Sequence, residues 1–332
     1  MPIPLLRLPL LVLDEVIKNV AFRQLLTLSL CSKRMHWVVK NLRDKSIELM
    51  LELIDNVSIS VCGKTDVINC YLFEKNSRRR LLLFDMYPMP KRHVEGWRDD
   101  RCRGGVFQED IDGFSSYWED GEEGARWLVE HISDLFGVQV ETVILCNDSL
   151  WILDVVEERQ GPRSYNAEIK SYGIPDDQLR HLLVDLNPTS LSISVPRCDT
   201  FRIENFQKTY EELRLSWGNW ITGENLLTLD CSRLSIAVKK FTVAEMNRFL
   251  RHVLVDGGAP RLTEFDALVE HCEANSILEG IRKVLTPIPG EKQFQNNGWK
   301  WEFVGMMNRG NQSERVVITC YESTLITLTF KE

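Results

Sequence analysis

The first 42 residues carry more apolar surface than a unit of their size can bury. Between Leu8 and Leu42, apolar side chains recur at helical spacing in three consecutive segments. They are Val12, Leu13, Val16, Ile17 and Val20 in the first segment, Leu25, Leu26, Leu28 and Leu30 in the second, and Met35, Val38, Val39 and Leu42 in the third, which begins near Ser32. A unit of about 35 residues is below the size at which its own hydrophobic core suffices. Part of this surface must therefore pack on the following domain or on another protein.

The order of residues in this stretch resembles an F-box. Leu8-Pro9 opens it, apolar pairs follow at helical spacing, and the run Leu-Ser-Leu-Cys-Ser-Lys-Arg at 28–34 closes the matching part. Two residues depart from the family pattern, since many F-boxes carry Glu where this chain has Leu11 and Trp where it has Met35. F-boxes are three-helix motifs that dock on a Skp-family adaptor and so join a cullin-based SCF ubiquitin ligase.

The resemblance implies a Skp-family adaptor as partner and, through it, a cullin. It also implies a set of adaptor-binding residues that lie between the F-box core and the adaptor's helices. These are Leu8, Pro9, Val12, Leu13, Val16, Ile17, Leu25, Leu28 and Leu30. The alternative is that the three helices pack only onto their own domain.

The distribution of charge argues against a general nucleic-acid binder. The formal net charge is −8, whereas nucleic-acid-binding surfaces carry an excess of positive charge. Residues 1–45 hold eight Lys or Arg and three acids, so this segment is +5 and the remainder is −13. The basic N-terminus suits an acidic partner, as Skp-family adaptors are, and increases the association rate more than the affinity.

No segment has the roughly 18–20 consecutive apolar residues that a membrane span requires. Arg7 and Pro9 interrupt the early leucine-rich run, and Asp14-Glu15 end it before a signal peptide is complete. The nine cysteines form no close pairs, which is typical of reduced thiols. We therefore expect a cytoplasmic or nuclear protein that binds no membrane and no nucleic acid.

After the helical stretch, residues 46–124 form a β-rich segment in which the apolar period changes from 3.6 to 2. Strands are predicted over 47–53, 57–61, 68–73 and 81–87. Arg78-Arg79-Arg80 favours a solvated hairpin tip, with a phosphate or acidic-partner site as the alternative. Glycines, seven acids from Glu109 to Glu123 and interleaved aromatic residues predict a long charged loop over 88–124. This loop either holds a protein partner or is a poorly ordered insertion.

From residue 125 to 332, helical and strand patterns alternate. Helices are predicted over 127–136, 176–186 and 243–253, and strands over 140–145, 191–195, 213–217, 234–238 and 262–265. The last four strands start at spacings of 22, 21 and 28 residues, which lie within the range of leucine-rich repeats. The asparagine ladder of such repeats is missing, so an LRR-like domain and an ordinary α/β domain with unequal repeats both stay open.

A second resemblance lies in this region. Thr222–Leu229 and the following Cys-Ser-Arg-Leu-Ser-Ile at 231–236 resemble the F-box-associated domain of the expanded nematode F-box families. That family commonly ends in β structure, and alternating residues here predict two final strands over 315–321 and 325–330. The expected fold class is α+β or α/β: a three-helix F-box at 1–45, the β-rich segment at 46–124, and a large strand–helix domain at 125–332, LRR-like in its second half.

Motifs of catalysis and metal binding are missing from the sequence. It contains no glycine-rich phosphate loop, no GxSxG, no HExxH and no CxxC. His181, His252 and His271 are isolated, and Cys231 and Cys272 are more typical of small buried apolar residues than of nucleophiles. We therefore expect no catalytic residue, no metal site and no cofactor.

Trp217, Asn219 and Trp220 form the most distinctive cluster of the second half. Aromatic residues on the concave face of a curved repeat domain are good anchors for a protein target, so these three residues are candidate substrate contacts. The alternative is that the tryptophans belong to the core.

These patterns predict a substrate-recruiting subunit of an SCF ubiquitin ligase, with an unidentified protein target. A second hypothesis is a non-degradative F-box protein that sequesters or neutralises one partner. A third is an uncharacterised enzyme in the large domain, which a polar pocket with convergent titratable groups would favour.

Overall fold

The computed structural model describes most of the chain. The described residues are 5–43, 50–54, 58–62, 67–74, 92–94, 106–109, 113–145, 150–170, 174–194, 201–204, 206–216, 220–309, 312–322 and 324–331. The chain divides into two compact units, Met1–Tyr165 and Asn166–Glu332. The boundary predicted at residue 124 thus lies inside the first unit.

The first unit begins with the three predicted helices. A 3₁₀ turn, η1 (Leu5–Arg7), precedes α1 (Leu10–Lys18), α2 (Phe22–Ser29) and α3 (Lys33–Leu42). α3 begins next to Ser32, as the sequence predicted, and the side chain of Ser32 caps the helix by accepting a hydrogen bond of 3.1 Å from the Met35 N–H. The buried side chains of these helices are Leu13, Ile17, Leu25, Leu26, Leu30, Met35, Val38 and Val39.

A mixed sheet follows the helices. Its strands are β1 (Met50–Ile54), β2 (Ser58–Cys62), β3 (Val67–Glu74), β4 (Arg92–Val94), β5 (Val106–Glu109), β6 (Gly113–Trp118) and β7 (Val140–Leu145). Their order is β7-β1-β2-β3-β6-β5-β4, with β1 parallel to β7, β3 parallel to β6 and the other pairs antiparallel. Within the described residues this confirms the strands predicted over 47–53, 57–61 and 68–73. The strand predicted over 81–87 and the arginines at 78–80 lie outside the described residues.

The stretch 88–124 differs from the long loop that the sequence predicted. It contains β4, β5 and β6, and β6 lies inside the sheet between β3 and β5. The side chains of Ser115, Ser116, Tyr117 and Trp118 are all buried. The prediction was wrong here because small polar residues fill interior positions of β6, and such residues hide the apolar alternation that marks a strand.

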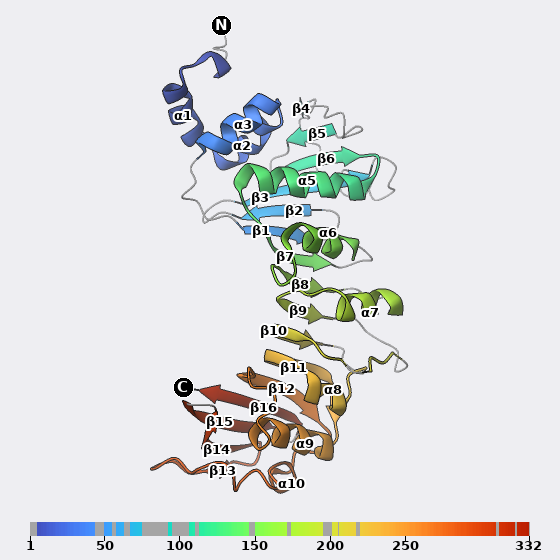
Figure 1. The fold of residues 1–332 in the computed structure, drawn as a ribbon, viewed down its shortest axis with the longest axis vertical. Helices are drawn as coiled ribbons and strands as arrows, with labels where there is room; N and C mark the ends of the chain where they lie inside the picture. Colours follow the sequence, from blue (N-terminus) through green and yellow to red (C-terminus); the bar gives the residue numbers. More distant parts are fainter. Residues whose placement is uncertain are drawn as a thin grey trace. The chain divides into compact units, whose positions relative to one another are not determined.

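Two helices complete the first unit. α5 (Gly121–Phe136) contacts β3 and β6 and lies across them in Figure 1. It begins six residues before the predicted start because the side chain of Asp120 caps the N–H groups of Glu122 and Glu123. Gly124 is required at its position, since a Cβ there would lie 2.4 Å from the ring of Trp118. α6 (Trp151–Gln160) follows β7.

The second unit contains a nine-strand sheet among its described residues. Its elements are β8 (Asn166–Ile169), α7 (Asp176–Val184), β9 (Ser190–Ile193), β10 (Thr209–Leu215), α8 (Gly223–Thr228), β11 (Asp230–Phe241), α9 (Val243–Leu254), β12 (Glu264–Val269), α10 (Ala274–Ile277), β13 (Phe294–Asn296), β14 (Lys300–Arg309), β15 (Gln312–Tyr321) and β16 (Leu325–Lys331). The strand order is β8-β9-β10-β11-β12-β16-β15-β14-β13. β8 to β12 run parallel, and the pairs from β12 to β13 are antiparallel.

The strands of the parallel half repeat with unequal steps. Asn166 pairs with Ser190, Ser190 with Glu212 and Thr209 with Asp230, so the first three steps are 24, 22 and 21 residues. The last step is 31 residues, because Arg233 pairs with Glu264. The predicted strands and the helix over 243–253 are confirmed, and so are the two final strands. Together with the N-terminal helices, this gives the expected α+β class. The leucine-rich-repeat interpretation stays a prediction.

Candidate functional site

The first turn of α1 presents apolar side chains to solvent. Leu10, Leu11 and Val12 are 60%, 82% and 45% exposed, and Pro9, which precedes the helix, is exposed as well. We call these four residues the α1 patch. A group of exposed apolar side chains at one site of a soluble protein commonly marks a protein-binding surface.

The residues predicted to bind the adaptor fall into three groups by burial. Pro9 and Val12 are exposed; Leu8, Val16 and Leu28 are partly buried; Leu13, Ile17, Leu25 and Leu30 are buried in the core of the three helices. The last group supports the helices from within. Adaptor contact by any of the nine residues stays a prediction.

The sequence prediction missed Leu10 and treated Leu11 only as a departure from the family pattern. The signal was the run Leu10-Leu11-Val12, since three successive residues on a helix point in directions about 100° apart. A run of this kind cannot turn every side chain to the same core.

A second feature is the contact between the F-box-like helices and α5, which we call the α3–α5 joint. Asp134 on α5 accepts hydrogen bonds from His36 Nε2 at 2.9 Å and from Lys40 Nζ at 2.5 Å, both on α3. Arg43, just after α3, donates through Nε to the carbonyl oxygen of Leu135 at 3.0 Å and through Nη2 to that of Phe136. These bonds attach α3 to the C-terminal half of α5.

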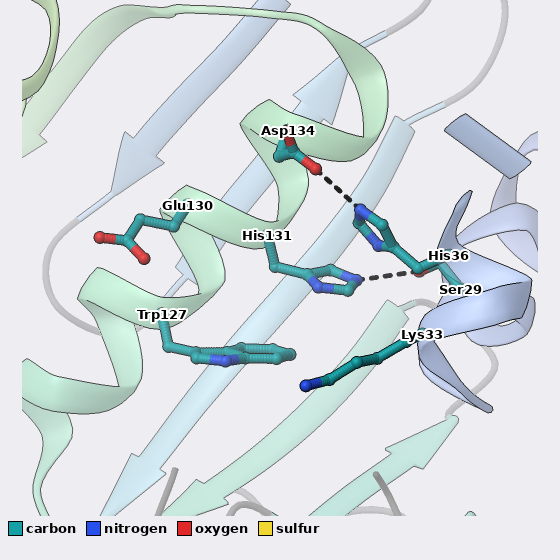
Figure 2. Close-up of a pocket in the computed structure, with 7 residues that line it drawn as sticks. All are labelled: Ser29, Lys33, His36, Trp127, Glu130, His131 and Asp134. Atoms are coloured by element: carbon teal, nitrogen blue, oxygen red, sulfur yellow. Dashed lines mark hydrogen bonds and ion pairs between the residues drawn. The ribbon is translucent and has the colours of Figure 1, made fainter. Parts of the chain in front are cut away.

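A cleft of about 250 Å³ lies along this joint. Figure 2 shows side chains from α2, α3 and α5 pointing toward one another around it. Its lining residues are Ser29, Lys33, His36, Trp127, Glu130, His131 and Asp134. The sequence did not predict that these residues meet, because the two halves of the cleft are about a hundred positions apart in the chain.

His131 is the central residue of the cleft. Its ring stacks on Trp127 with centroids 4.7 Å apart and lies 4.6 Å from the ring of His36. Burial, followed by the charge of His36, lowers the pKa of His131 to about 3, although the negative charge of Asp134 acts in the opposite direction. His131 is therefore neutral at physiological pH.

Asp134 keeps its negative charge. Burial alone would raise the pKa of this carboxyl group, but the hydrogen bonds and positive charges of Lys40 and His36 outweigh burial and lower it. The carboxylate therefore stays available to both α3 donors across the physiological range.

The cleft does not have the geometry of a nucleophile with its base. Ser29 Oγ lies 2.9 Å from His131 Nε2, but the serine is buried and its hydroxyl donates to the Leu26 carbonyl oxygen at 2.7 Å. Because that proton is engaged, the Nε2–H of neutral His131 donates to the serine oxygen. A histidine with so low a pKa is also a weak general base. This geometry favours a structural joint over catalysis.

The candidate substrate contacts lie in the second unit. Trp220 is 1% exposed, and its ring meets those of Phe201 and Phe206 edge-on at 5.9 and 5.5 Å. In this structure Trp220 belongs to an aromatic core and offers no surface to a partner. Trp217 and Asn219 lie outside the described residues, and substrate contact by them stays a prediction.

Two cysteine thiols of the second unit are poor nucleophiles. Burial raises the pKa of the Cys231 thiol to about 12, and a hydrogen bond with Cys320, followed by burial, raises that of Cys272. Within the described ranges, no three His, Cys, Asp or Glu side chains cluster in a way that could hold a metal ion. None of the helices that the structure describes combines the length and apolarity of a membrane-crossing helix.

Two family models match the chain. Residues 5–46 match the F-box domain, and residues 200–266 match an F-box-associated domain. No curated protein and no solved structure gives a significant match. The matches confirm both resemblances drawn from the sequence. Domains of these two kinds are characteristic of non-catalytic adaptor proteins.

Proposed function

Because this chain carries an F-box followed by an F-box-associated domain, we propose that it is a substrate-recruiting subunit of a Skp-cullin-F-box ubiquitin ligase. The F-box binds a Skp-family adaptor, the adaptor binds a cullin, and the second unit holds a protein target. The proposal places the chain in the cytoplasm or nucleus, where these complexes act.

The observation that carries this proposal is the α1 patch. The three helices already bury a core of their own, and yet Leu10, Leu11 and Val12 remain exposed. Covering such side chains with a partner's groove removes apolar area from water, at about 25 cal/mol per Å². An interface of about 1,600 Å² in total is typical of a stable complex and is within reach of a three-helix unit.

The α3–α5 joint connects the proposed adaptor-binding helices to the rest of the first unit. Hydrogen bonds from His36, Lys40 and Arg43 hold the F-box helices on α5, and α5 in turn packs on β3 and β6. A bound adaptor is thereby connected to the sheet of the first unit through packed elements. A ligase of this type acts by holding the target close to the ubiquitin-conjugating enzyme. A packed connection between adaptor and sheet therefore restricts the positions on the target that ubiquitin can reach.

Co-purification of the full chain with a Skp-family adaptor tests the proposal. Val12→Asp places a charge in the patch without disturbing the core, because Val12 is already exposed. We expect the wild type to retain the adaptor and Val12→Asp to lose at least about tenfold in affinity, as for a central interface residue.

Two controls match this variant. Val255→Asp makes the same change at an exposed apolar residue of the second unit and is expected to retain the adaptor. Val284→Asp makes the same change at another exposed apolar residue of the second unit and is also expected to retain the adaptor. Failure of the wild type to retain the adaptor, or undiminished binding by Val12→Asp, would contradict the proposal.

A further inference from the structure

The second unit ends its sheet with an open strand edge. β13 pairs with β14 through the register Phe294–Phe303, Gln295–Glu302 and Asn296–Trp301. Among the strands that the structure describes, none pairs with the other side of β13 (Figure 1). An unpaired edge offers backbone donors and acceptors to any extended segment that reaches it.

The ladder between β13 and β14 shows which backbone groups face outward. Asn297 N–H donates to the Lys300 carbonyl oxygen at 3.0 Å, and the Gln293 carbonyl oxygen accepts from Val304 N–H at 2.9 Å. Hydrogen-bonded and non-hydrogen-bonded positions alternate along an antiparallel pair. The middle residue of β13 therefore faces β14, and the backbone groups of its first and last residues face the open edge.

An aromatic side chain is exposed on this edge. Phe294, the first residue of β13, is 39% exposed, and the guanidinium of Arg282 lies over its ring at 5.4 Å. Trp299, in the turn after β13, lies toward β15 instead, with its ring 6.0 Å from that of Tyr321. Natural sheet edges are usually protected by charges or prolines, whereas this edge presents an aromatic anchor of the kind found at binding hot spots.

The same segment carries positive charge in an acidic chain. Residues 281–300 contain four Lys or Arg and one acid, whereas the whole chain has a net charge of −8. The single acid, Glu291, is engaged with Arg315 at 2.9 Å. Lys283 and Lys292 are exposed and form no ion pair with any residue that the structure describes. The surroundings of the edge therefore favour an acidic ligand.

From these observations we propose that the β13 edge binds an extended acidic peptide segment of a protein target by adding it as a further strand. Backbone hydrogen bonds to Phe294 and Asn296 supply the pairing, and the ring of Phe294 receives an apolar side chain of the segment. Arg282 and Lys292 attract its acids. Strand addition of this kind obtains affinity from the main chain and specificity from alternate side chains. The assignment of the bound protein as a substrate of the ligase rests on the proposed function, whereas the binding of the peptide segment does not.

The test begins with a library of displayed random 12-residue peptides selected on the purified full chain. We expect the enriched peptides to carry Asp and Glu around a central apolar residue and to contain no proline in that centre. A selected peptide is then synthesised with a fluorescent label, and its affinity is measured by anisotropy. The same peptide, N-methylated at alternate residues, lacks the N–H groups that form a strand and is the comparison probe.

Matched variants isolate each part of the site. Asn296→Pro removes one outward N–H from an edge strand, where proline is tolerated, and Asn296→Ala keeps that N–H while removing the same side chain. We expect binding to fall about tenfold more for Asn296→Pro than for Asn296→Ala, and at least about tenfold for Phe294→Ala. Lys292→Glu should weaken binding and reduce its dependence on salt. Val255→Ala, which trims another exposed apolar residue of this unit, should bind as the wild type does.

Several outcomes would overturn this inference. They are a selection that enriches no peptide, enriched peptides that are basic, and equal binding by the wild type, Asn296→Pro and Phe294→Ala. A concentration-dependent dimer in sedimentation experiments that Asn296→Pro abolishes would instead assign the edge to a second copy of the chain. Adaptor co-purification with the same variants is expected to be unchanged. Peptide binding without adaptor retention would refute the ligase proposal alone, and adaptor retention without peptide binding would refute this inference alone.

Discussion

At the scale of single residues, His131 is the clearest case of a side chain whose chemistry is set by its surroundings. The ring lies between Trp127 and His36, and burial, followed by the charge of His36, disfavours its charged form. A histidine in an unfolded chain titrates at about 6.5, whereas the pKa of His131 in the folded protein is about 3. Between these two values the unfolded chain binds a proton that the folded chain does not.

This difference makes the stability of the first unit depend on pH. The contribution of His131 is fully present above pH 6.5 and falls as the pH drops from about 6.5 toward 3, because protons then favour the unfolded state. At pH 5 we expect a loss of about 2 kcal/mol relative to pH 7 from this residue. Urea denaturation followed by circular dichroism at pH 7, 6 and 5 measures it.

The matched variant is His131→Gln, which can still hydrogen-bond but does not titrate. Its stability should change less between pH 7 and 5 than that of the wild type. His181→Gln, at a histidine of the second unit, should leave the pH dependence of the first unit unchanged. Identical pH profiles for the wild type and His131→Gln would refute the assignment.

At the scale of elements, the α3–α5 joint decides how the N-terminal helices are attached. Exposed ion pairs such as Lys40–Asp134 contribute little to stability, generally below 1 kcal/mol. Arg43 makes the more demanding contact, because its guanidinium reaches two carbonyl oxygens at the end of α5 and lies 5.7 Å from the centre of the Phe136 ring. The last carbonyl groups of a helix have no partners within the helix, so this arginine satisfies groups that would otherwise be unpaired.

Substitution of Arg43 should therefore weaken the joint. We expect Arg43→Ala to reduce the free energy of unfolding of the first unit by about 1–3 kcal/mol. Arg43→Lys should recover only part of this loss, because an ammonium group cannot reproduce the two-pronged contact. Arg34→Ala, at an exposed arginine of α3, should change stability by less than about 0.5 kcal/mol. Equal effects of Arg43→Ala and Arg34→Ala in urea denaturation would contradict this role.

At the scale of the whole molecule, the two proposed binding surfaces belong to different units. The α1 patch lies in the first and the β13 edge in the second. A chain that carries two such surfaces can join an adaptor to a target without contributing a reacting group. It can equally sequester a partner, and the two functions differ in the fate of that partner.

Pulse-chase measurement of the bound partner's lifetime separates these functions. If the chain recruits targets for ubiquitination, Val12→Asp should lengthen the partner's lifetime and lower its ubiquitination, since the target remains bound but the ligase is absent. Val255→Asp should leave both unchanged. If the chain sequesters its partner, Val12→Asp should alter neither quantity. That second result would favour the non-degradative hypothesis.

The sequence by itself determined the elements whose signals are local. The three N-terminal helices follow from apolar spacing, and the strands β9 to β12 follow from alternation near Leu191, Leu213 and Leu234. The F-box and the associated domain were recognisable for the same reason, because their motifs are runs of neighbouring residues.

Only the tertiary structure decided which surfaces are free and which distant residues meet. It buried Trp220 among Phe201 and Phe206, placed β6 inside a sheet, and left the α1 patch exposed. His36 and Asp134 are separated by 98 positions, and no local pattern indicates their contact. Burial and pairing depend on what another part of the chain brings to the same place, which a periodic pattern along one segment cannot specify.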